Sequence, residues 1–259
     1  MVSTRPSLRE QYRLAFAQIW DWEWTKAGLR AMPWFIQQAR AYHALPGAEH
    51  MQLRDLYPQL HDRHPTHEIG GQYFFMSAWA MRRILAARPT THLDIAGNVN
   101  FVAALSASLP VTFLDYRPLE VTLSGLTSIP GDILALPMAD NSQESVSCLH
   151  VAEHIGLGRY GDPLDPAGTR KAAGELARIL APGGILYFAL PVGSPRTCFN
   201  AHRVHTAVQI RDYFAGLELV EYSGLDDNGQ FHEHVPVDTF DRSSYACGMF
   251  RLTKEGACA

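Results

Sequence analysis

THLDIAGNVNF, residues 91–101, places a short apolar strand before Asp94 and a turn of small residues directly after it. The next apolar strand, in VTFLDYRP, ends at Asp115, and PGDILALP carries Asp132 after a third strand. In open parallel sheets, ligands bind beyond the carboxyl ends of the strands, and an acidic residue about 20 positions after the first turn is well placed for ribose hydroxyls. Three carboxylates at three strand ends therefore predict an α/β sheet that binds a nucleoside.

After about residue 70, helical and strand-like segments alternate along the chain. Helices are predicted near 72–87, 100–108, 167–180 and 206–215, and strands near 91–96, 111–115, 126–129, 145–151, 184–190, 217–224 and 245–252. The alternation predicts a doubly wound, mostly parallel sheet of seven strands. The last two strands flank a long acidic loop, which is typical of an antiparallel pair at a sheet edge.

Residues 1–70 differ in composition from the rest of the chain. Tryptophans crowd at helical spacing between residues 20 and 34, and a connector rich in Pro, His and Asp follows them. We expect a helical N-terminal extension or lid over 1–70 and an α/β domain over 71–259. Tryptophan-rich helical faces are typical of packing, so these helices are expected to pack on the main sheet or to form a homo-oligomer interface.

The composition narrows the class of protein. With 47% hydrophobic residues among 259, the chain can bury one large core. The net charge of −4 offers no broad basic surface, which disfavours nucleic acid as a partner. The four cysteines form no CxxC pair and the N-terminus shows no apolar signal segment, so we expect a cytoplasmic protein. No apolar run reaches the roughly 18 residues of an integral membrane segment.

Four segments resemble the class I S-adenosylmethionine-dependent methyltransferases. LDIAGNVN stands where that superfamily has its glycine-rich first loop, and LDY supplies the acid after the second strand. GDILALPMADNSQESVSCLHVAEHI matches the third and fourth strands, and ELARILAPGGILYFALP matches a helix-PGG-strand segment. HVAEHIGLGRYGDPLDP, with CFNAHRVH, resembles a narrower set of uncharacterised bacterial proteins, the domain of unknown function 268 family. The resemblance implies a Rossmann-like methyltransferase fold over residues 91 to 252, with S-adenosylmethionine as the cofactor.

This resemblance places the cofactor at the strand ends. It implies that the turn after Asp94 faces the methionine part, that Asp115 binds the ribose diol and that Asp132 binds the adenine amino group. A carboxylate accepts two hydroxyl protons at once, and a neighbouring apolar side chain covers the purine face. The expected cofactor-binding residues are Asp94, Ala96, Gly97, Asn98, Asp115, Tyr116, Asp132, Ile133 and His150.

The chemical step is expected at the H-x-x-E-H run that ends the fourth predicted strand, His150 to His154. Methyl transfer by in-line displacement requires an aligned acceptor and, for a hydroxyl, removal of its proton. We expect His154 to be the catalytic base, because an imidazole titrates near neutral pH, and Glu153 to orient it or bind a substrate hydroxyl. The alternative is that both residues only hydrogen-bond the glycine-rich loop behind them.

A second polar cluster follows the fifth predicted strand, in CFNAHRVH. Its imidazoles and those of the H-x-x-E-H run could together hold a divalent metal with Asp162 or Asp165. The favoured interpretation is that His202 and His205 cap the next helix or pack beneath the loop. No metal site is therefore predicted. Arginines here and in the preceding loop are candidate clamps for an anionic group. The expected substrate-binding residues are Arg159, Tyr160, Asn200, His202, Arg203 and His205.

These features predict a methyltransferase that acts on a hydroxyl of a small molecule or a sugar-containing substrate. One alternative is a non-catalytic scaffold with a degenerate methyltransferase fold, because Ala96, Asn98 and Asn100 occupy positions that are usually glycine. The other is a metal-dependent hydrolase, because zinc enzymes also use an H-x-x-E-H motif. That motif belongs on a helix, whereas here it follows a strand and precedes a glycine-rich loop, which disfavours the hydrolase.

Overall fold

The computed structural model describes residues 19–63, 65 and 71–256. The chain divides into two compact units, Met1–Glu68 and Ile69–Ala259. Parts of the predicted N-terminal extension, residues 1–18, 64 and 66–70, lie outside the described residues. None of the helices in the described ranges combines the length and the apolar character that crossing a bilayer requires.

The first unit is built on helix α2 (Trp22–His43), and the short 3₁₀ helix η1 (Leu53–Asp55) follows it. The carboxylate of Asp21 caps α2 by accepting a hydrogen bond from the backbone N–H of Trp24, 2.9 Å away. The indole of Trp24 stacks on the ring of His61, with 4.1 Å between the ring centroids. The connector after α2 therefore packs on that helix.

The second unit holds an eight-stranded sheet in the order β3-β2-β1-β4-β5-β10-β8-β9. The strands are β1 (His92–Ile95), β2 (Val111–Asp115), β3 (Leu126–Pro130), β4 (Gln143–Leu149), β5 (Leu180–Val192), β8 (Glu218–Leu225), β9 (Phe231–His232) and β10 (Ala246–Thr253). The first five in spatial order are parallel, and β10 runs antiparallel to both β5 and β8. The doubly wound, mostly parallel fold and the antiparallel pair of late strands are thereby confirmed.

Two additions lie outside the predicted pattern. β9 is an eighth, edge strand of two residues, and β6 (Arg196–Cys198) pairs with β7 (His202–Val204) in a separate hairpin. Segments of two or three residues are too short to show the alternation of a strand, so periodicity does not reveal them.

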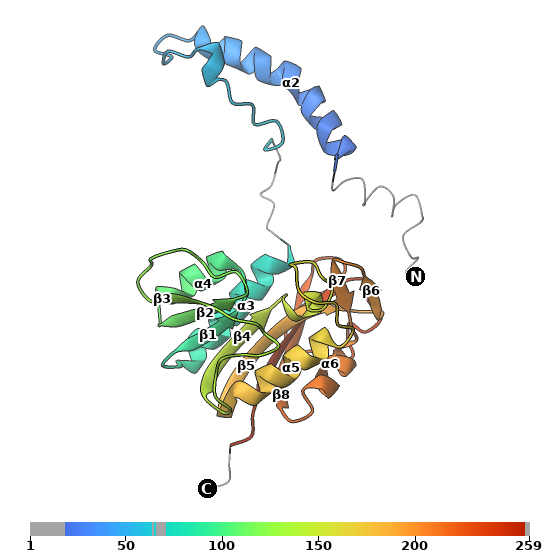
Figure 1. The fold of residues 1–259 in the computed structure, drawn as a ribbon. Coiled ribbons are helices and arrows are strands. Elements are labelled where there is room, and N and C mark those ends of the chain that lie inside the picture. Colours follow the sequence, from blue (N-terminus) through green and yellow to red (C-terminus); the bar gives the residue numbers. More distant parts are fainter. Residues whose placement is uncertain (1–18, 64, 66–70, 257–259) are drawn as a thin grey trace. The chain divides into compact units, whose positions relative to one another are not determined.

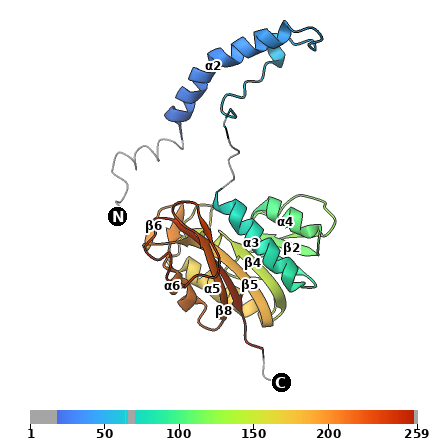
Figure 2. The same ribbon diagram turned by 180° about the vertical axis from the view of Figure 1, so that it is seen from behind.

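Helices cover both faces of the sheet, as Figures 1 and 2 show from opposite sides. The helices are α3 (Gln72–Ala87), α4 (Val99–Ser106), α5 (Gly168–Ile179) and α6 (Ala207–Tyr213). α3 and α4 pack on one face, and α5 and α6 on the other. Each face closes its own apolar core, because α3 buries residues such as Trp79 and Ile84 at helical spacing and α5 does the same with Ala172 and Leu176.

The first loop after β1 keeps the turn of a glycine-rich loop without its full set of glycines. Ala96 lies in the left-handed region, at φ 52°. A Cβ on Gly97 would stand 2.6 Å from an oxygen of Asp94, so only glycine fits there. Asn98 caps α4 by accepting from the backbone N–H of Asn100 at 2.9 Å. The substitutions at the expected glycine positions therefore leave the turn in place.

Candidate functional site

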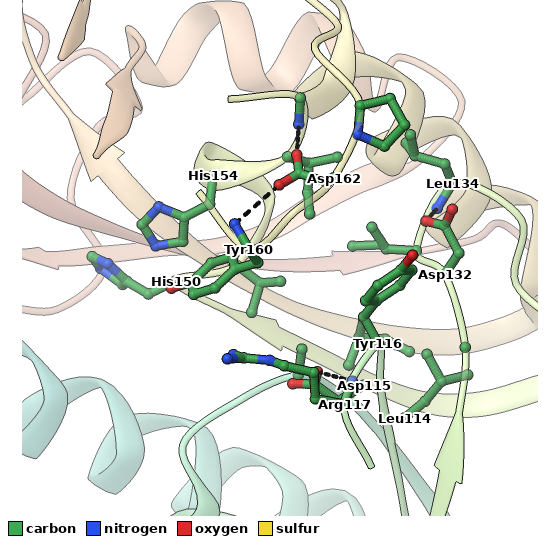
Figure 3. Close-up of a pocket in the computed structure, with 18 residues that line it drawn as sticks. Leu114, Asp115, Tyr116, Arg117, Asp132, Leu134, His150, His154, Tyr160 and Asp162 are labelled. Atoms are coloured by element: carbon green, nitrogen blue, oxygen red, sulfur yellow. Dashed lines mark hydrogen bonds between the residues drawn. The ribbon is translucent and has the colours of Figure 1, made fainter. Parts of the chain in front are cut away.

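A cavity of about 260 Å³ opens at the carboxyl ends of the parallel strands, in the second unit. Figure 3 shows His150 and His154 at one end of it and Asp132 at the other. It is lined by Ile95, Ala96, Leu114, Asp115, Tyr116, Arg117, Gly131, Asp132, Ile133, Leu134, His150, Val151, His154, Ile155, Gly156, Tyr160, Asp162 and Pro163. The crevice expected from the strand-end carboxylates is thus present.

Asp115 and Asp132 both line the cavity, and each is held by the chain just after it. One oxygen of Asp115 accepts from the backbone N–H of Arg117 at 2.7 Å, and one oxygen of Asp132 accepts from that of Leu134 at 2.8 Å. Within the described residues, no protein donor reaches the second oxygen of either carboxylate. Each carboxylate is therefore fixed in orientation and still has an acceptor for a ligand.

Apolar side chains lie between these acids. Ile133 and Leu134 line the cavity beside Asp132, and Leu114 lies on the neighbouring strand. A Cβ on Gly131 would stand 2.7 Å from Leu114, so glycine keeps the two segments in close contact there. The wall suits the flat, apolar face of a purine.

Asp94, unlike the other two acids, does not reach the cavity. It is fully buried and accepts hydrogen bonds from the backbone N–H of Gly97, at 2.8 Å, and from the hydroxyl of Ser147. Burial raises its pKa to about 6, although both hydrogen bonds oppose the rise. Asp94 thus holds the first loop from below. Of that loop, Ala96 lines the cavity, whereas Gly97 and Asn98 do not.

The structure brings His150, Glu153 and His154 together, at the end of β4 and in the 3₁₀ helix η2 (Ala152–His154). Oε1 of Glu153 lies 3.0 Å from Nδ1 of His150 and 3.7 Å from Nε2 of His154. Burial opposes the charge of Glu153, but the two imidazoles hold its pKa below the usual value. Burial likewise opposes the charge of His150, yet Cys247 and Glu153 raise the pKa of that imidazole well above its usual value.

The tautomer of His154 follows from its backbone partner. Its Nδ1 lies 2.5 Å from the carbonyl oxygen of Ala201, which can only accept, so Nδ1 carries the hydrogen. Nη1 of Arg159 donates to the same carbonyl at 3.1 Å. Nε2 of His154 is therefore the nitrogen with the lone pair, and it lies on the side of Glu153. A base of this kind accepts a proton while a nearby carboxylate stabilises the resulting charge.

Arg203 holds the loop that carries Tyr160, and it does not line the cavity. Its guanidinium is buried and donates to the carbonyl oxygens of Ile155, at 2.5 Å, and Asp165, at 2.9 Å. In the same loop, Asp162 accepts from the backbone N–H of Gly156 at 2.6 Å. The expected role of Arg203 as an anion clamp needs correction, because its hydrogen bonds go to the main chain.

Arg203→Met should loosen this loop and cost about 1–3 kcal/mol of stability, because partly buried carbonyl oxygens lose their donors. Hydrogen exchange followed by mass spectrometry should show faster exchange of the amides between residues 156 and 162. Arg211→Met, at an exposed site on α6, controls for the loss of one arginine. Exchange in that segment as slow as in the unaltered protein would contradict the role of Arg203 as a loop anchor.

The other residues that were expected to bind substrate fall into two groups, inside and outside the cavity lining. Tyr160 lines the cavity, whereas Arg159 and Asn200 are exposed and outside it. His202 lies in the β6–β7 hairpin against the ring of Tyr245, at 4.9 Å between centroids, and burial lowers its pKa. His205 is bridged to Val192, and burial with Arg203 lowers its pKa to about 4.

The structure shows which residue caps α6 and how the side chains of the H-x-x-E-H run are arranged. Thr206 caps α6, with Gln209 completing the capping box, so neither His202 nor His205 does so. In the part of the chain that the structure describes, no three His, Cys, Asp or Glu side chains are arranged to hold a metal ion. The H-x-x-E-H run lies on a strand end and a 3₁₀ turn, and its carboxylate stands between the two imidazoles. This is not the arrangement of a zinc hydrolase, in which both histidines share one helical face.

Arg117 was not expected at the site from the sequence. It lines the cavity, and its guanidinium lies 4.8 Å from the ring centroid of Tyr160, while that of Arg159 lies 5.2 Å from the same ring. Two guanidinium groups from separate loops thus stack on one tyrosine at the cavity. Arg117 follows Asp115 by two residues, in a loop at the carboxyl edge of the sheet, and this position in the sequence could have indicated it.

Two solved structures, each with a TM-score of 0.50, support this description of the fold. The chain resembles the N-methyltransferase NodS from Bradyrhizobium japonicum WM9 at 18% identity and a TM-score of 0.50, over 69% of this chain and 94% of NodS. It resembles the [4+2]-cyclase SpnF at 13% identity and a TM-score of 0.50, over 71% and 82% of the two chains. NodS in complex with S-adenosyl-L-homocysteine matches at 17% identity and a TM-score of 0.49, over 84% and 97%.

At the level of sequence, residues 138–235 match the model of the family described as Caenorhabditis protein of unknown function, DUF268. The description names Caenorhabditis, not the bacteria expected from the sequence. No protein of curated function matches the chain. Identities this low to the solved structures establish a shared fold alone. The chain therefore has the fold of the class I S-adenosylmethionine-dependent methyltransferases, and within it residues 138–235 resemble the DUF268 family.

Proposed function

We propose that this protein is an S-adenosylmethionine-dependent methyltransferase. One observation carries the proposal: Asp115 and Asp132, at the ends of neighbouring parallel strands, line the same cavity as His154. A nucleoside needs hydroxyl acceptors and an amine acceptor, and a methyl acceptor with an acidic proton needs a base. The three side chains supply these functions within one cavity. NodS, with the same fold, is a methyltransferase by name.

The cavity fits such a cofactor in its chemistry. The second oxygen of Asp115 would accept from the ribose diol, and that of Asp132 from the adenine amino group. Ile133 and Leu134 would cover the purine, and Ala96 would face the methionine part. When bound, the cofactor would supply a methyl group on a positively charged sulfonium. His150 would lie at the same end of the cavity as the base.

His154 would activate the acceptor. Its Nε2 holds the lone pair, so it would take the proton of an acceptor hydroxyl as that oxygen becomes the nucleophile. Glu153, with Oε1 3.7 Å from this nitrogen, would stabilise the imidazolium. The carbonyl of Ala201 would keep the ring in the required tautomer. The chain thus supplies orientation and proton removal.

The acceptor is proposed to be a hydroxyl of a small molecule or of a sugar-containing compound. Polar groups on the acceptor side, namely the backbone-anchored Asp162 and the phenol of Tyr160, support a hydroxyl-bearing compound. Arg117 and Arg159 would add attraction for an anionic group on the same molecule.

Two further proposals concern setting and assembly. The cysteines in the described ranges, Cys148, Cys198 and Cys247, are free thiols, which supports a reducing cytoplasm. Trp20, Trp22 and Trp24 in the first unit are each more than half exposed, which supports a role of the 1–70 extension as a lid or a homo-oligomer interface.

Asp115→Ala should weaken binding of S-adenosylmethionine and S-adenosylhomocysteine by about 1–3 kcal/mol, the range for a lost charge-assisted hydrogen bond. Isothermal titration of both ligands into the full chain, with metal analysis of the same sample, measures this. Asp212→Ala, at an exposed carboxylate on α6, is the matched control and should leave the affinity unchanged. Unchanged affinity in Asp115→Ala would remove the ribose assignment. No binding to the unaltered protein would overturn the methyltransferase and favour the scaffold.

A further inference from the structure

Cys247, which has no part in the proposed methyl transfer, contacts a residue of the cavity wall. It lies on β10 and is 1% exposed. Its Sγ lies 3.2 Å from Nε2 of His150, and Nδ1 of the same ring lies 3.0 Å from Oε1 of Glu153. A thiol, an imidazole and a carboxylate from three separate segments are therefore in consecutive contact.

Two features of this cluster are costly for the fold. His150 holds a left-handed backbone, at φ 58°, which is unfavourable for a residue other than glycine. Glu153 is completely buried, and within the described residues neither of its oxygens has a hydrogen bond of good geometry, since the approach of Nδ1 is close but not aligned. Backbone strain and buried polar atoms without an aligned hydrogen bond concentrate at functional sites. Simple packing does not account for them.

The contacts are those of a nucleophile with its base. If Nδ1 of His150 carries the hydrogen toward Glu153, the lone pair on Nε2 faces the thiol. The imidazole then takes the thiol proton, and the carboxylate stabilises the imidazolium. Imperfect alignment is common for such groups before a reactant binds. A lone buried thiol has none of these partners.

The burial of Cys247 limits the size of its reactant. The thiol itself does not line the cavity, but His150, in contact with it, does and is 6% exposed. The side chain of His150 is therefore in contact with both the sulfur and the cavity. A sulfur this deeply buried excludes an acyl or peptide substrate and leaves only a small reactant.

We propose that Cys247, His150 and Glu153 form a nucleophilic triad and that Cys247 is a site of oxidation by hydrogen peroxide. The sulfur attacks one peroxide oxygen, so that an S–O bond forms and the O–O bond breaks. The thiol proton passes to Nε2 of His150 and then to the departing hydroxide, which leaves as water. Sulfur loses two electrons to the peroxide, and the products are a cysteine sulfenic acid and water. This step does not depend on the proposed cofactor.

The other two described cysteines provide internal comparisons. Cys148 is equally buried, and burial, with Glu153 and Asp94, raises the pKa of its thiol well above the usual value. Cys198 is half-buried on β6. Exposure alone predicts that Cys198 reacts first, whereas the triad predicts Cys247.

The test is to treat the reduced full chain with one equivalent of hydrogen peroxide, trap sulfenic acid with dimedone and quantify each cysteine peptide by mass spectrometry. We expect Cys247 to be labelled at least about 10²-fold faster than Cys148 or Cys198, the low end of general-base effects. Glu153→Gln should slow labelling of Cys247 by about 10-fold or more and leave Cys198 unchanged. Cys148→Ser should leave the labelling of Cys247 unchanged.

Glu153→Gln also separates the triad from a structural role. If Glu153 only supported packing, its loss would loosen the site and speed the labelling of Cys247. Labelling of Cys198 ahead of Cys247, no labelling at Cys247, or an equal or faster rate at Cys247 in Glu153→Gln would each overturn the triad. The order of labelling in the unaltered protein decides the question even if the variant does not fold.

Discussion

His154→Ala should lower the rate of methyl transfer by about 10²-fold or more while S-adenosylmethionine still binds. Nε2 of this imidazole is free to take an acceptor proton, because Nδ1 is committed to the carbonyl of Ala201. The measurement is single-turnover transfer of a labelled methyl group to an acceptor that the unaltered protein methylates, alongside titration of the cofactor.

His232→Ala is the matched control, since His232 lies on the short edge strand β9 and pairs with Asp226 outside the cavity. It should leave the rate unchanged. A His154→Ala protein with full activity would show that the base lies elsewhere or is not needed. Loss of cofactor affinity together with activity would instead mean that His154 supports the cavity wall.

Asp94→Asn should make the protein more stable near pH 8, by up to about 3 kcal/mol, which is about two pKa units at 1.36 kcal/mol each. Burial raises the pKa of Asp94 to about 6 from 3.8, so the folded state prefers the protonated acid. The stabilising effect of that preference is complete below about pH 4 and is lost as the pH rises through 6. Asparagine is neutral throughout and can still accept from the N–H of Gly97.

The measurement is the free energy of unfolding in denaturant at pH 4, 5, 6 and 8. The advantage of Asp94→Asn over the unaltered protein should grow between pH 4 and pH 6 and then level off. Asp212→Asn, at an exposed site, reports the effect of removing one surface charge, which is subtracted. A difference that does not vary with pH would show that the buried carboxylate is not the titrating group.

Local sequence patterns determined most of the fold. The helix predicted over 72–87 has those bounds in the structure, and the strand predicted over 111–115 is β2. Long elements with one buried face carry a periodicity that reveals them. β5 begins at Leu180, four residues before its predicted start, because that residue pairs with Gln143 across a register shift. Pairing between strands of this kind cannot be recognised from the local sequence pattern.

At the site, the sequence by itself determined which acids end the strands, and hence that Asp115 and Asp132 meet at one edge of a parallel sheet. The sequence did not determine in which direction each acidic side chain points or how deeply it is buried. Asp94, one residue before the end of β1, points into the core, where Ser147 and Gly97 hold it. Side chains alternate between the faces of a strand, and only the packed sheet decides which face a terminal residue meets.

Only the tertiary structure decided what the histidines and arginines contact. The sequence predicts that Arg203 binds an anionic group, but its guanidinium donates to main-chain carbonyls. Arg117, which the sequence did not indicate, stacks on Tyr160 at the cavity. Cys247 lies 97 positions from His150 in the chain and 3.2 Å from it in space. The sequence thus determined the helices and strands and the edge of the sheet at which the cavity lies, because these follow from local periodicity and chain direction. The structure alone decided the partners of polar side chains, because those depend on segments that are distant in the chain.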